Sequence, residues 1–346
     1  MKKLLVLFVC LMMSLAIFGC GTTDEEVPVT GNVQVESLSI QFVPSKDADV
    51  ILTAAAPLAD MLIAKLAEKG FDVGSVDITV GTSYAAVGEA MISGSIDIGF
   101  IPASTYVQYA GDGVELLLIA TRDAKMVETA IPMDYNTGDA NGSGEGQSTN
   151  YRSLFYVNIA SDEGAALYAK VEAGEALTWE DINSVTVCSG SSTSGASFVY
   201  PSLWLNTNFG MTLNDVDSII PDGGYTDNMS KLVSNQCQIT FGYNDVRSDV
   251  DKTETWNDTY GMDGTVWDYI KVIAVSDPIM NDTISVSTAS EKMTPELITA
   301  LQESFVEIAQ TDEGLATVAP YSHKGYIIGS DADYDSTRAA NALFAE

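Results

Sequence analysis

A run of hydroxyl-bearing residues follows a β-like segment near the middle of the chain. The segment, residues 184–187, reads Ser-Val-Thr-Val, and after it come Ser192, Thr193, Ser194 and Gly195. Apolar residues at helical spacing follow, so the hydroxyls lie where a helix is expected to begin. The first turn of a helix exposes unpaired backbone N–H groups and the positive end of its dipole. Together these groups could bind an oxyanion, although an ordinary helix N-cap has the same pattern.

Hydroxyl groups also stand at the ends of two other expected elements. Ser83 and Tyr84 begin a segment with helical spacing, and Ser104 and Thr105 come just beyond a buried strand expected over 96–101. Ligands of open α/β sheets bind at the carboxyl ends of the strands, where these hydroxyls could donate to an oxyanion. The simpler alternatives are a half-buried core tyrosine and a turn or N-cap pair.

Short apolar runs alternate with amphipathic segments along the chain, which is typical of an α/β fold. Strands are expected at 37–43, 76–80, 96–101, 114–120, 154–159, 184–188, 216–220, 238–242, 270–275 and 283–286. Helices are expected at 57–69, 84–93, 195–206, 227–235, 294–309 and 333–344. The segment 134–150, rich in Asn and Gly, is expected to be a solvated surface loop, and 249–264 is expected to be irregular.

These elements divide into two α/β units, after which the chain returns to the first. We therefore expect a discontinuous first domain, made of 36–150 and 266–346, and a second domain, 160–265. The hinge crossings between them would be 151–159 and 266–276. A ligand cleft is then expected between the two domains.

The N-terminus has the features of an export signal. Two lysines precede the apolar segment 4–18, which is too short for a confident membrane span, and Cys20 follows a glycine. This pattern resembles the lipobox of bacterial lipoproteins, which implies a signal peptide over 1–19 and lipidation of Cys20. The segment 20–35 lacks apolar periodicity and is expected to be a flexible tether.

Composition excludes several classes of function. The formal net charge is −32, which argues against partners such as nucleic acid and anionic membrane surfaces. A recessed site can still bind a small anion through local dipoles and hydroxyls. His323 is the single histidine and no Cys/His cluster exists, so no metal site is expected. Cys188 and Cys237 lie in strand-like runs and are expected to be buried thiols, although a disulfide is possible outside the cell.

Several motifs resemble, in order and spacing, those of the solute-binding proteins of ABC transporters for phosphonate, phosphite and related phosphorus oxyanions. The motifs are Thr-Ser-Tyr-Ala-Ala-Val at 82–87, Gly-Ser-Ile-Asp-Ile-Gly-Phe at 94–100, Pro-Ala-Ser-Thr-Tyr-Val at 102–107, Ser-Thr-Ser-Gly at 192–195, Asp-Pro-Ile-Met-Asn-Asp at 277–282, and Gly325-Tyr326 with Asp331, Asp333, Tyr334 and Arg338. The resemblance covers most of 37–340. It implies a type II periplasmic-binding-protein fold, with two sheets, flanking helices and a two-strand hinge.

The resemblance also implies which residues bind the ligand. The expected contacts are Ser83, Tyr84, Ser104 and Thr105 from the first domain, and Ser192, Thr193, Ser194 and Tyr225 from the second. Tyr225 follows a Gly-Gly turn where the family often has a histidine, and it can still donate a hydrogen bond. Asp245 lies where some members place an acidic residue against a ligand amine, although it could also be an exposed loop carboxylate. Such a site would hold a small tetrahedral oxyanion through many donors rather than through a salt bridge.

The function implied is that of a lipid-anchored receptor on the extracytoplasmic face of a bacterial cell membrane. It would capture a phosphonate, phosphite or phosphate and deliver it to an ABC permease, as a monomer and without a cofactor. The same fold could instead bind a sulfonate or a thiamine precursor. A third alternative, an exported serine hydrolase, would need His323 as its base, and the chain lacks a Gly-x-Ser-x-Gly motif.

Overall fold

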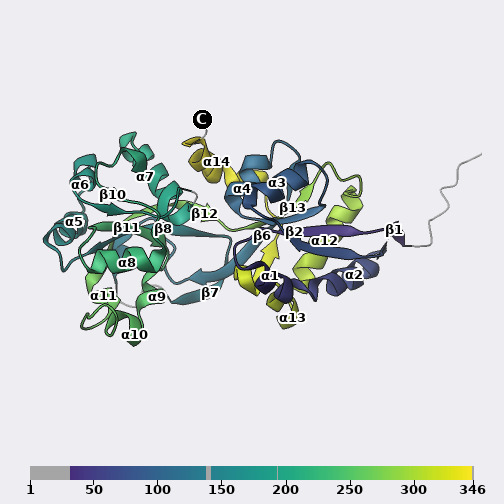
Figure 1. Ribbon diagram of the computed structural model, residues 1–346, viewed down its shortest axis with the longest axis horizontal. Helices are drawn as coiled ribbons and strands as arrows, with labels where there is room; N and C mark the ends of the chain where they lie inside the picture. The colour runs from purple at the N-terminus through teal and green to yellow at the C-terminus, as the bar shows by residue number, and fades with distance from the viewer. Residues whose placement is uncertain (1–31, 138–141, 193, 345–346) are drawn as a thin grey trace, which may run out of the picture.

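The computed structural model describes residues 32–137, 142–192 and 194–344. Within them the chain forms an elongated molecule of two lobes, each built on its own sheet (Figure 1). The first lobe holds the N-terminal strands, and the second lobe holds the middle of the chain. Helices flank both sheets, which confirms the predicted α/β fold.

The first lobe contains a seven-stranded sheet in the order β14-β6-β13-β5-β2-β4, with β7 paired to β6. Strands β2, β4 and β5 are parallel, whereas β13 runs antiparallel to its neighbours β5 and β6. The strands are β2 (Leu38–Phe42), β4 (Val76–Val80), β5 (Ile98–Ile101), β6 (Val114–Lys125), β7 (Ser143–Ser148), β13 (Thr283–Ser287) and β14 (Gly325–Ile327). The helices are α1 (Ala48–Ala55), α2 (Leu58–Glu68), α3 (Tyr84–Ile92), α4 (Ala103–Tyr109), α12 (Pro295–Ile308), α13 (Asp312–Thr317), η4 (Ala319–Tyr321) and η5 (Asp331–Tyr334).

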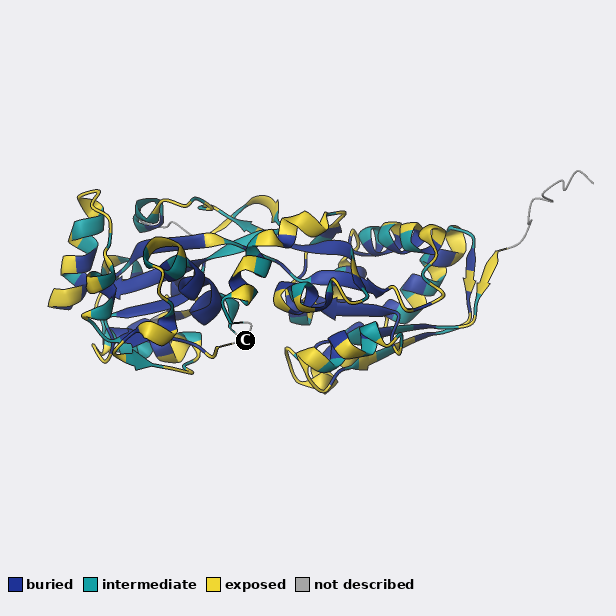
Figure 2. Ribbon diagram, turned by 90° about the horizontal axis from the view of Figure 1, so that it is seen from above, coloured by how far each residue is buried: buried dark blue, intermediate teal, exposed yellow. Residues whose placement is uncertain are grey.

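Apolar residues at the period of each element form the core of the first lobe. Helix α2 buries Leu58, Leu62 and Leu66 at helical spacing, and Figure 2 shows the strands of the lobe as a buried layer between more exposed helices. The continuous helical stretch 48–68 is also long and apolar enough to cross a membrane by length and composition. Here Leu58, Leu62 and Leu66 pack into the core of the first lobe. Thr294 caps α12 through the backbone N–H of Leu297, as predicted.

The second lobe contains a five-stranded sheet in the order β10-β9-β11-β8-β12. Its strands are β8 (Asn150–Asn158), β9 (Val187–Cys188), β10 (Ile219–Ile220), β11 (Ile239–Tyr243) and β12 (Ile270–Met280). Its helices are α5 (Asp162–Glu172), α6 (Trp179–Asn183), η2 (Gly195–Val199), α7 (Tyr200–Phe209), η3 (Leu213–Asp215), α8 (Tyr225–Val233), α9 (Arg247–Val250), α10 (Thr253–Trp256) and α11 (Val266–Tyr269). The segment 249–264, expected to be irregular, thus holds short helices.

The connection from the first sheet to the second is more ordered than the sequence predicts. Strand β6 continues past its expected end at 120, and η1 (Pro132–Asn136) then packs on the second sheet, with Tyr135 buried in that core. The chain next returns as β7 to pair with β6 before entering β8. The prediction of a surface loop over 134–150 is therefore wrong, because the backbone of its polar, Gly-rich part is paired to β6.

The return connection runs along β12. This strand pairs antiparallel with β8 as far as Met280, beyond the end of the expected crossing at 266–276. The chain then passes Asn281, whose side-chain amide donates to the carbonyl oxygens of Ala120 at 3.1 Å and Ser148 at 2.9 Å. This buried amide ties both crossings together at the hinge.

The C-terminal helix α14 (Asp335–Ala342) contacts both lobes. Asn341 donates to the carbonyl oxygen of Ser104 in the first lobe at 3.0 Å, and Thr337 is hydrogen-bonded to the hydroxyl of Tyr200 in the second lobe at 2.9 Å. The predicted terminal helix is therefore a further link between the lobes.

Two other expectations need correction. Residues 33–35, placed in a flexible tether over 20–35, form strand β1 (Val33–Val35), which pairs in parallel with β3 (Phe71–Val73). Cys188 and Cys237 are buried as expected, but they form a disulfide, with their Cα atoms 5.8 Å apart. The signal peptide 1–19 and Cys20 lie outside the described residues.

Candidate ligand site

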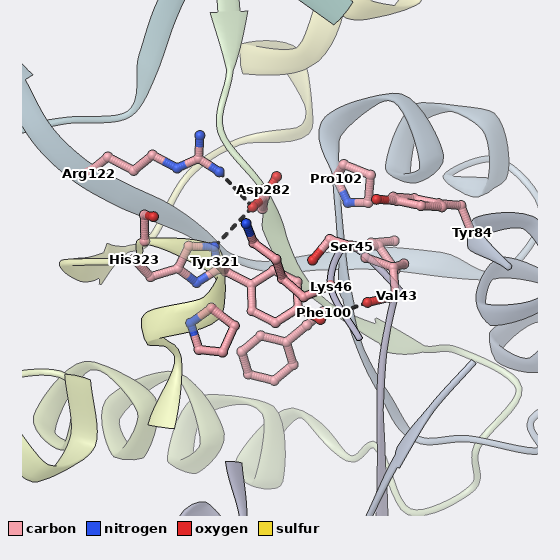
Figure 3. Close-up of a pocket in the computed structure, with 13 residues that line it drawn as sticks. Val43, Ser45, Lys46, Tyr84, Phe100, Pro102, Arg122, Asp282, Tyr321 and His323 are labelled. Carbon is pink, nitrogen blue, oxygen red and sulfur yellow. Dashed lines mark hydrogen bonds and ion pairs between the residues drawn. The ribbon is translucent and has the colours of Figure 1, made fainter. Parts of the chain in front are cut away.

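A pocket of about 290 Å³ opens in the first lobe, on the side where the parallel strands β2 and β5 end (Figure 3). Parallel strands bring their carboxyl ends to one edge of a sheet, so the loops that follow them line a common space. The lining residues are Val43, Ser45, Lys46, Tyr84, Phe100, Ile101, Pro102, Arg122, Asp282, Pro320, Tyr321, Ser322 and His323. The pocket therefore combines apolar walls with a small set of charged and hydroxyl groups.

Asp282 is the hub of the polar groups. Nη2 of Arg122 and Nε2 of His323 each lie 3.0 Å from its Oδ2. The other ring nitrogen of His323 contacts the hydroxyl of Tyr326 at 3.1 Å. Burial would raise the pKa of the Asp282 carboxyl, but hydrogen bonding to His323 and the charge of Arg122 outweigh it and lower this pKa. Asp282 is therefore held as a carboxylate between two nitrogen donors.

Two cationic side chains reach this pocket, which the sequence argument missed. Lys46 and Arg122 both line it, and Figure 3 shows the Lys46 side chain pointing toward Asp282. Among the described residues no carboxylate lies within ion-pair distance of Lys46. This pocket therefore differs from the neutral, hydroxyl-lined site that the sequence predicts. Lys46 follows the predicted strand 37–43. Its position just beyond a strand end could have indicated that it lies at the ligand side of the sheet.

The predicted residues of the first lobe divide into two groups. Tyr84 lines the pocket and is 41% exposed, and burial followed by the charge of Asp282 raises its pKa. Ser83 is the N-cap of α3 and accepts from the backbone N–H of Ala86 at 3.0 Å. Ser104 and Thr105 do not line the pocket, because both belong to the first turn of α4 and Thr105 is buried.

In the second lobe the expected hydroxyls come together in part. Oγ of Ser194 lies 3.3 Å from the hydroxyl of Tyr225 and accepts from Ser197 at 2.6 Å. The helix that begins at Gly195 starts beside them, in η2. Ser192 is in an exposed turn, and Thr193 lies outside the described residues. The structure therefore joins Ser194 and Tyr225, which are far apart in the sequence.

Tyr151 connects the two groups and was also missed. It lies on β8, and the centre of its ring is 5.9 Å from the guanidinium of Arg122. Its hydroxyl lies close to Gly195, at 3.7 Å from the position that a Cβ atom would take on that glycine. Burial, followed by the nearby Tyr225, raises its pKa. This hinge tyrosine thus stands between the first-lobe pocket and the Ser194–Tyr225 pair.

Asp245 is neither placed to contact a ligand amine nor exposed in a loop, the two alternatives that the sequence left open. Its carboxylate is buried and forms an ion pair with Arg247, with Oδ2 2.5 Å from Nη2. Its Oδ1 accepts from the Tyr156 hydroxyl at 3.1 Å and from Nε of Arg247 at 2.9 Å. It is not an exposed loop carboxylate. Because both oxygens already have internal donors, we do not retain Asp245 among the ligand contacts.

Among the residues that the structure describes, no group of three or more His, Cys, Asp or Glu side chains could hold a metal ion. Apart from Asp282, the polar groups described above are mainly hydroxyl donors and cations, which suit an anion. Residues 40–334 match the family described as ABC transporter, phosphonate, periplasmic substrate-binding protein. This chain belongs to that family. The protein is accordingly the substrate-binding component of an ABC transporter, which captures its solute outside the cytoplasm for a membrane permease.

Relatives of this binding protein support the assignment. It is 24% identical over 336 residues to the phosphate-import protein PhnD of Mycolicibacterium smegmatis (strain ATCC 700084 / mc(2)155), with 92% of this chain and 89% of that protein covered. Among solved structures, PhnD1 of Prochlorococcus marinus (MIT 9301) in complex with methylphosphonate has a TM-score of 0.54 at 12% identity, covering 89% of this chain and 98% of that one. XAC2383 of Xanthomonas citri bound to ATP has a TM-score of 0.58 at 12% identity, covering 89% and 96%. These similarities confirm the two-lobed binding-protein fold.

Proposed function

We propose that the protein binds a phosphorus oxyanion between its two lobes, with the phosphorus group held at the start of the helix that begins at Gly195. The observation that carries this proposal is the meeting of Ser194 with Tyr225 beside that helix start. Backbone N–H groups and hydroxyls there are donors without charge, and an oxyanion can accept from several of them at once. Tyr84 of the first lobe would complete the contacts when the lobes close.

The relatives supply the chemical class of the ligand. PhnD of M. smegmatis is named for phosphate import, and PhnD1 of P. marinus was solved with methylphosphonate. We carry these ligands over as candidates, together with phosphite. Domain closure around a ligand is a known device of periplasmic binding proteins, and it assembles a site from two half-sites.

Calorimetry of residues 21–346 tests the proposal, with phosphate, phosphite, methylphosphonate, aminoethylphosphonate and sulfate as ligands. At least one phosphorus ligand should bind, and sulfate should bind more weakly. The double variant Thr193→Ala, Ser194→Ala should lose two charge-assisted hydrogen bonds, each worth about 1.5–3 kcal/mol. Unchanged affinity in a variant with an unchanged melting curve would remove these residues from the site.

We also propose that Cys20 anchors the protein to the membrane through lipid, on the basis of the basic, apolar and Gly-Cys pattern before it. Cys20→Ser should move the protein from the membrane fraction to the soluble fraction of the cells that export it. A variant that still partitions into detergent would contradict the anchor.

We infer further that the protein is not a hydrolase. The two ring nitrogens of its single histidine, His323, are engaged by Asp282 and by the Tyr326 hydroxyl. A Ser-His-Asp hydrolase needs a histidine nitrogen that can take the serine proton, and in this arrangement both ring nitrogens of His323 already have other partners. Esterase and phosphatase assays with chromogenic substrates should give no turnover, and activity abolished by His323→Gln would contradict the inference.

A further inference from the structure

The first-lobe pocket holds more positive charge than an inorganic oxyanion held by hydroxyls requires. The chain has 16 Lys and Arg residues against 48 Asp and Glu residues, so positive charge is scarce in it. Lys46 has no carboxylate within ion-pair distance among the described residues, and it lines the same pocket as Arg122. The single carboxylate in the lining, Asp282, is already shared by Arg122 and His323. The pocket therefore has a net positive charge within a strongly acidic protein.

Arg122 also keeps donors that its ion pair does not use. A guanidinium presents five N–H groups, and Asp282 accepts from Nη2. Its Nε is buried and has no acceptor among the described residues. The side chain remains 36% exposed, so a ligand can approach the guanidinium from the pocket. Arginine forms its strongest and most selective contacts with planar carboxylates and with phosphates.

The size of the pocket also favours a ligand larger than an inorganic oxyanion. A volume of about 290 Å³ on one lobe alone corresponds to roughly ten water molecules at about 30 Å³ each. An inorganic tetrahedral oxyanion bound at Ser194 and Tyr225 would leave this space to water. Apolar groups such as Phe100 and Tyr321 form part of its wall, which suits a carbon-containing substituent.

Building on the proposed function, we propose that the natural ligand is an organophosphonate with a second anionic group, a carboxylate, and that Lys46 and Arg122 receive this group. The phosphorus oxyanion would then lie at the second lobe and the carboxylate in the first-lobe pocket, past Tyr151. The carbon substituent between them contacts the apolar wall. Lys46 and Arg122 are thus specificity-determining residues for the substituent rather than for the phosphorus group.

Calorimetry with matched ligands tests this assignment. Methylphosphonate supplies the phosphonate alone. Phosphonoacetate and 3-phosphonopropionate add a carboxylate at two different distances from the phosphorus atom. We expect the better of the two carboxylates to bind at least about tenfold more tightly than methylphosphonate, as one extra charge-assisted contact allows. In Lys46→Met this advantage should largely disappear, while methylphosphonate affinity stays the same. The control Lys324→Met removes a charge that pairs with Asp123 outside the pocket and should change neither affinity.

Other outcomes separate the two proposals. Equal affinity for methylphosphonate and both carboxylates, or a carboxylate advantage that survives in Lys46→Met and in Arg122→Lys, would overturn the second anionic subsite. An equal loss of all three ligands in Lys46→Met would overturn it as well, because Lys46 would then serve the phosphonate. If phosphate or phosphite binds and none of the three does, the second anionic subsite is overturned while the proposed function stands. If none of these phosphorus ligands binds the wild-type protein, the proposed function itself fails. Melting curves of each variant show whether a loss of binding reflects a loss of fold.

Discussion

Nε2 of His323 lies 3.0 Å from Oδ2 of Asp282, and the histidine side chain is fully buried in the wall of the first-lobe pocket. An ionised carboxylate is an acceptor only, so Nε2 carries the proton of this hydrogen bond. Nδ1 can then accept from the hydroxyl of Tyr326. The charge that a ligand meets in the first lobe is therefore set by a chain of contacts that begins in the core.

The first prediction concerns pH. Because hydrogen bonding and Arg122 lower the pKa of the Asp282 carboxyl in the folded protein, this group stabilises the fold above its unfolded pKa of about 3.9. That contribution is lost as the pH falls through the lower folded value. Asp282→Asn should therefore reduce the free energy of unfolding by about 1–3 kcal/mol near pH 7. Denaturant unfolding at a series of pH values should show the difference shrinking in acid.

The matched control for this prediction is Asp123→Asn. It removes the same charge from an exposed pair with Lys324, which is separated by 3.3 Å and screened by solvent. Exposed pairs of this kind contribute about 0–1 kcal/mol. A difference between Asp282→Asn and wild type that stays constant down to acid pH would contradict the role given to Asp282.

The second prediction concerns the buried pair of Asp245 and Arg247. Arg247→Met would leave the Asp245 carboxylate buried without its cation, and removing one partner of such a pair costs about 3–5 kcal/mol. The double variant Arg247→Met, Asp245→Leu should be less destabilised than the single one, because no uncompensated charge remains. Denaturant unfolding measures both. Ligand affinity and ligand ranking should stay unchanged wherever the variants are folded; a changed ranking would return Asp245 to the ligand site.

The third prediction concerns the disulfide. Cys188 and Cys237 are separated by 49 positions in the sequence. Closing a loop of that length lowers the entropy of the unfolded chain and stabilises the fold by about 4 kcal/mol in the chain-entropy description. The variant Cys188→Ala, Cys237→Ala should lose stability of this order in denaturant unfolding. In the presence of reductant, the wild-type protein also lacks the disulfide, so the variant should then differ from it only by the two truncated thiols. If the variant loses no more stability without reductant than with it, the stabilising role of the disulfide is contradicted.

The fourth prediction concerns closure. If the ligand joins the first-lobe pocket to the Ser194–Tyr225 pair, saturating ligand should shift the protein toward a closed state. Small-angle scattering should show a smaller radius of gyration with ligand than without it. The variant Thr193→Ala, Ser194→Ala should show no contraction at the same ligand concentration. An unchanged radius for the wild-type protein at saturation would exclude a site shared by two lobes.

Much of the scaffold follows from local patterns in the sequence. Strand β4 and the N-cap Thr294 were predicted as they occur, because period-two alternation and side-chain capping depend on neighbours in the chain. The segment 134–150 was misjudged for the opposite reason. Its Gly-rich composition favours a loop, whereas the pairing of β7 with Arg122–Lys125 of β6 provides hydrogen bonds that composition cannot indicate.

The sequence by itself determined the fold class, the family motifs and the hydroxyl-rich helix start at Ser194. Tertiary structure alone decided how charge is distributed at the site. It brought Arg122, Asp282 and His323 together from three separate segments, and it bonded Asp245 to Arg247 instead of to solvent. The physical reason is that hydroxyl motifs and helix starts are local, whereas the partner of a charged group depends on which strand ends meet in space.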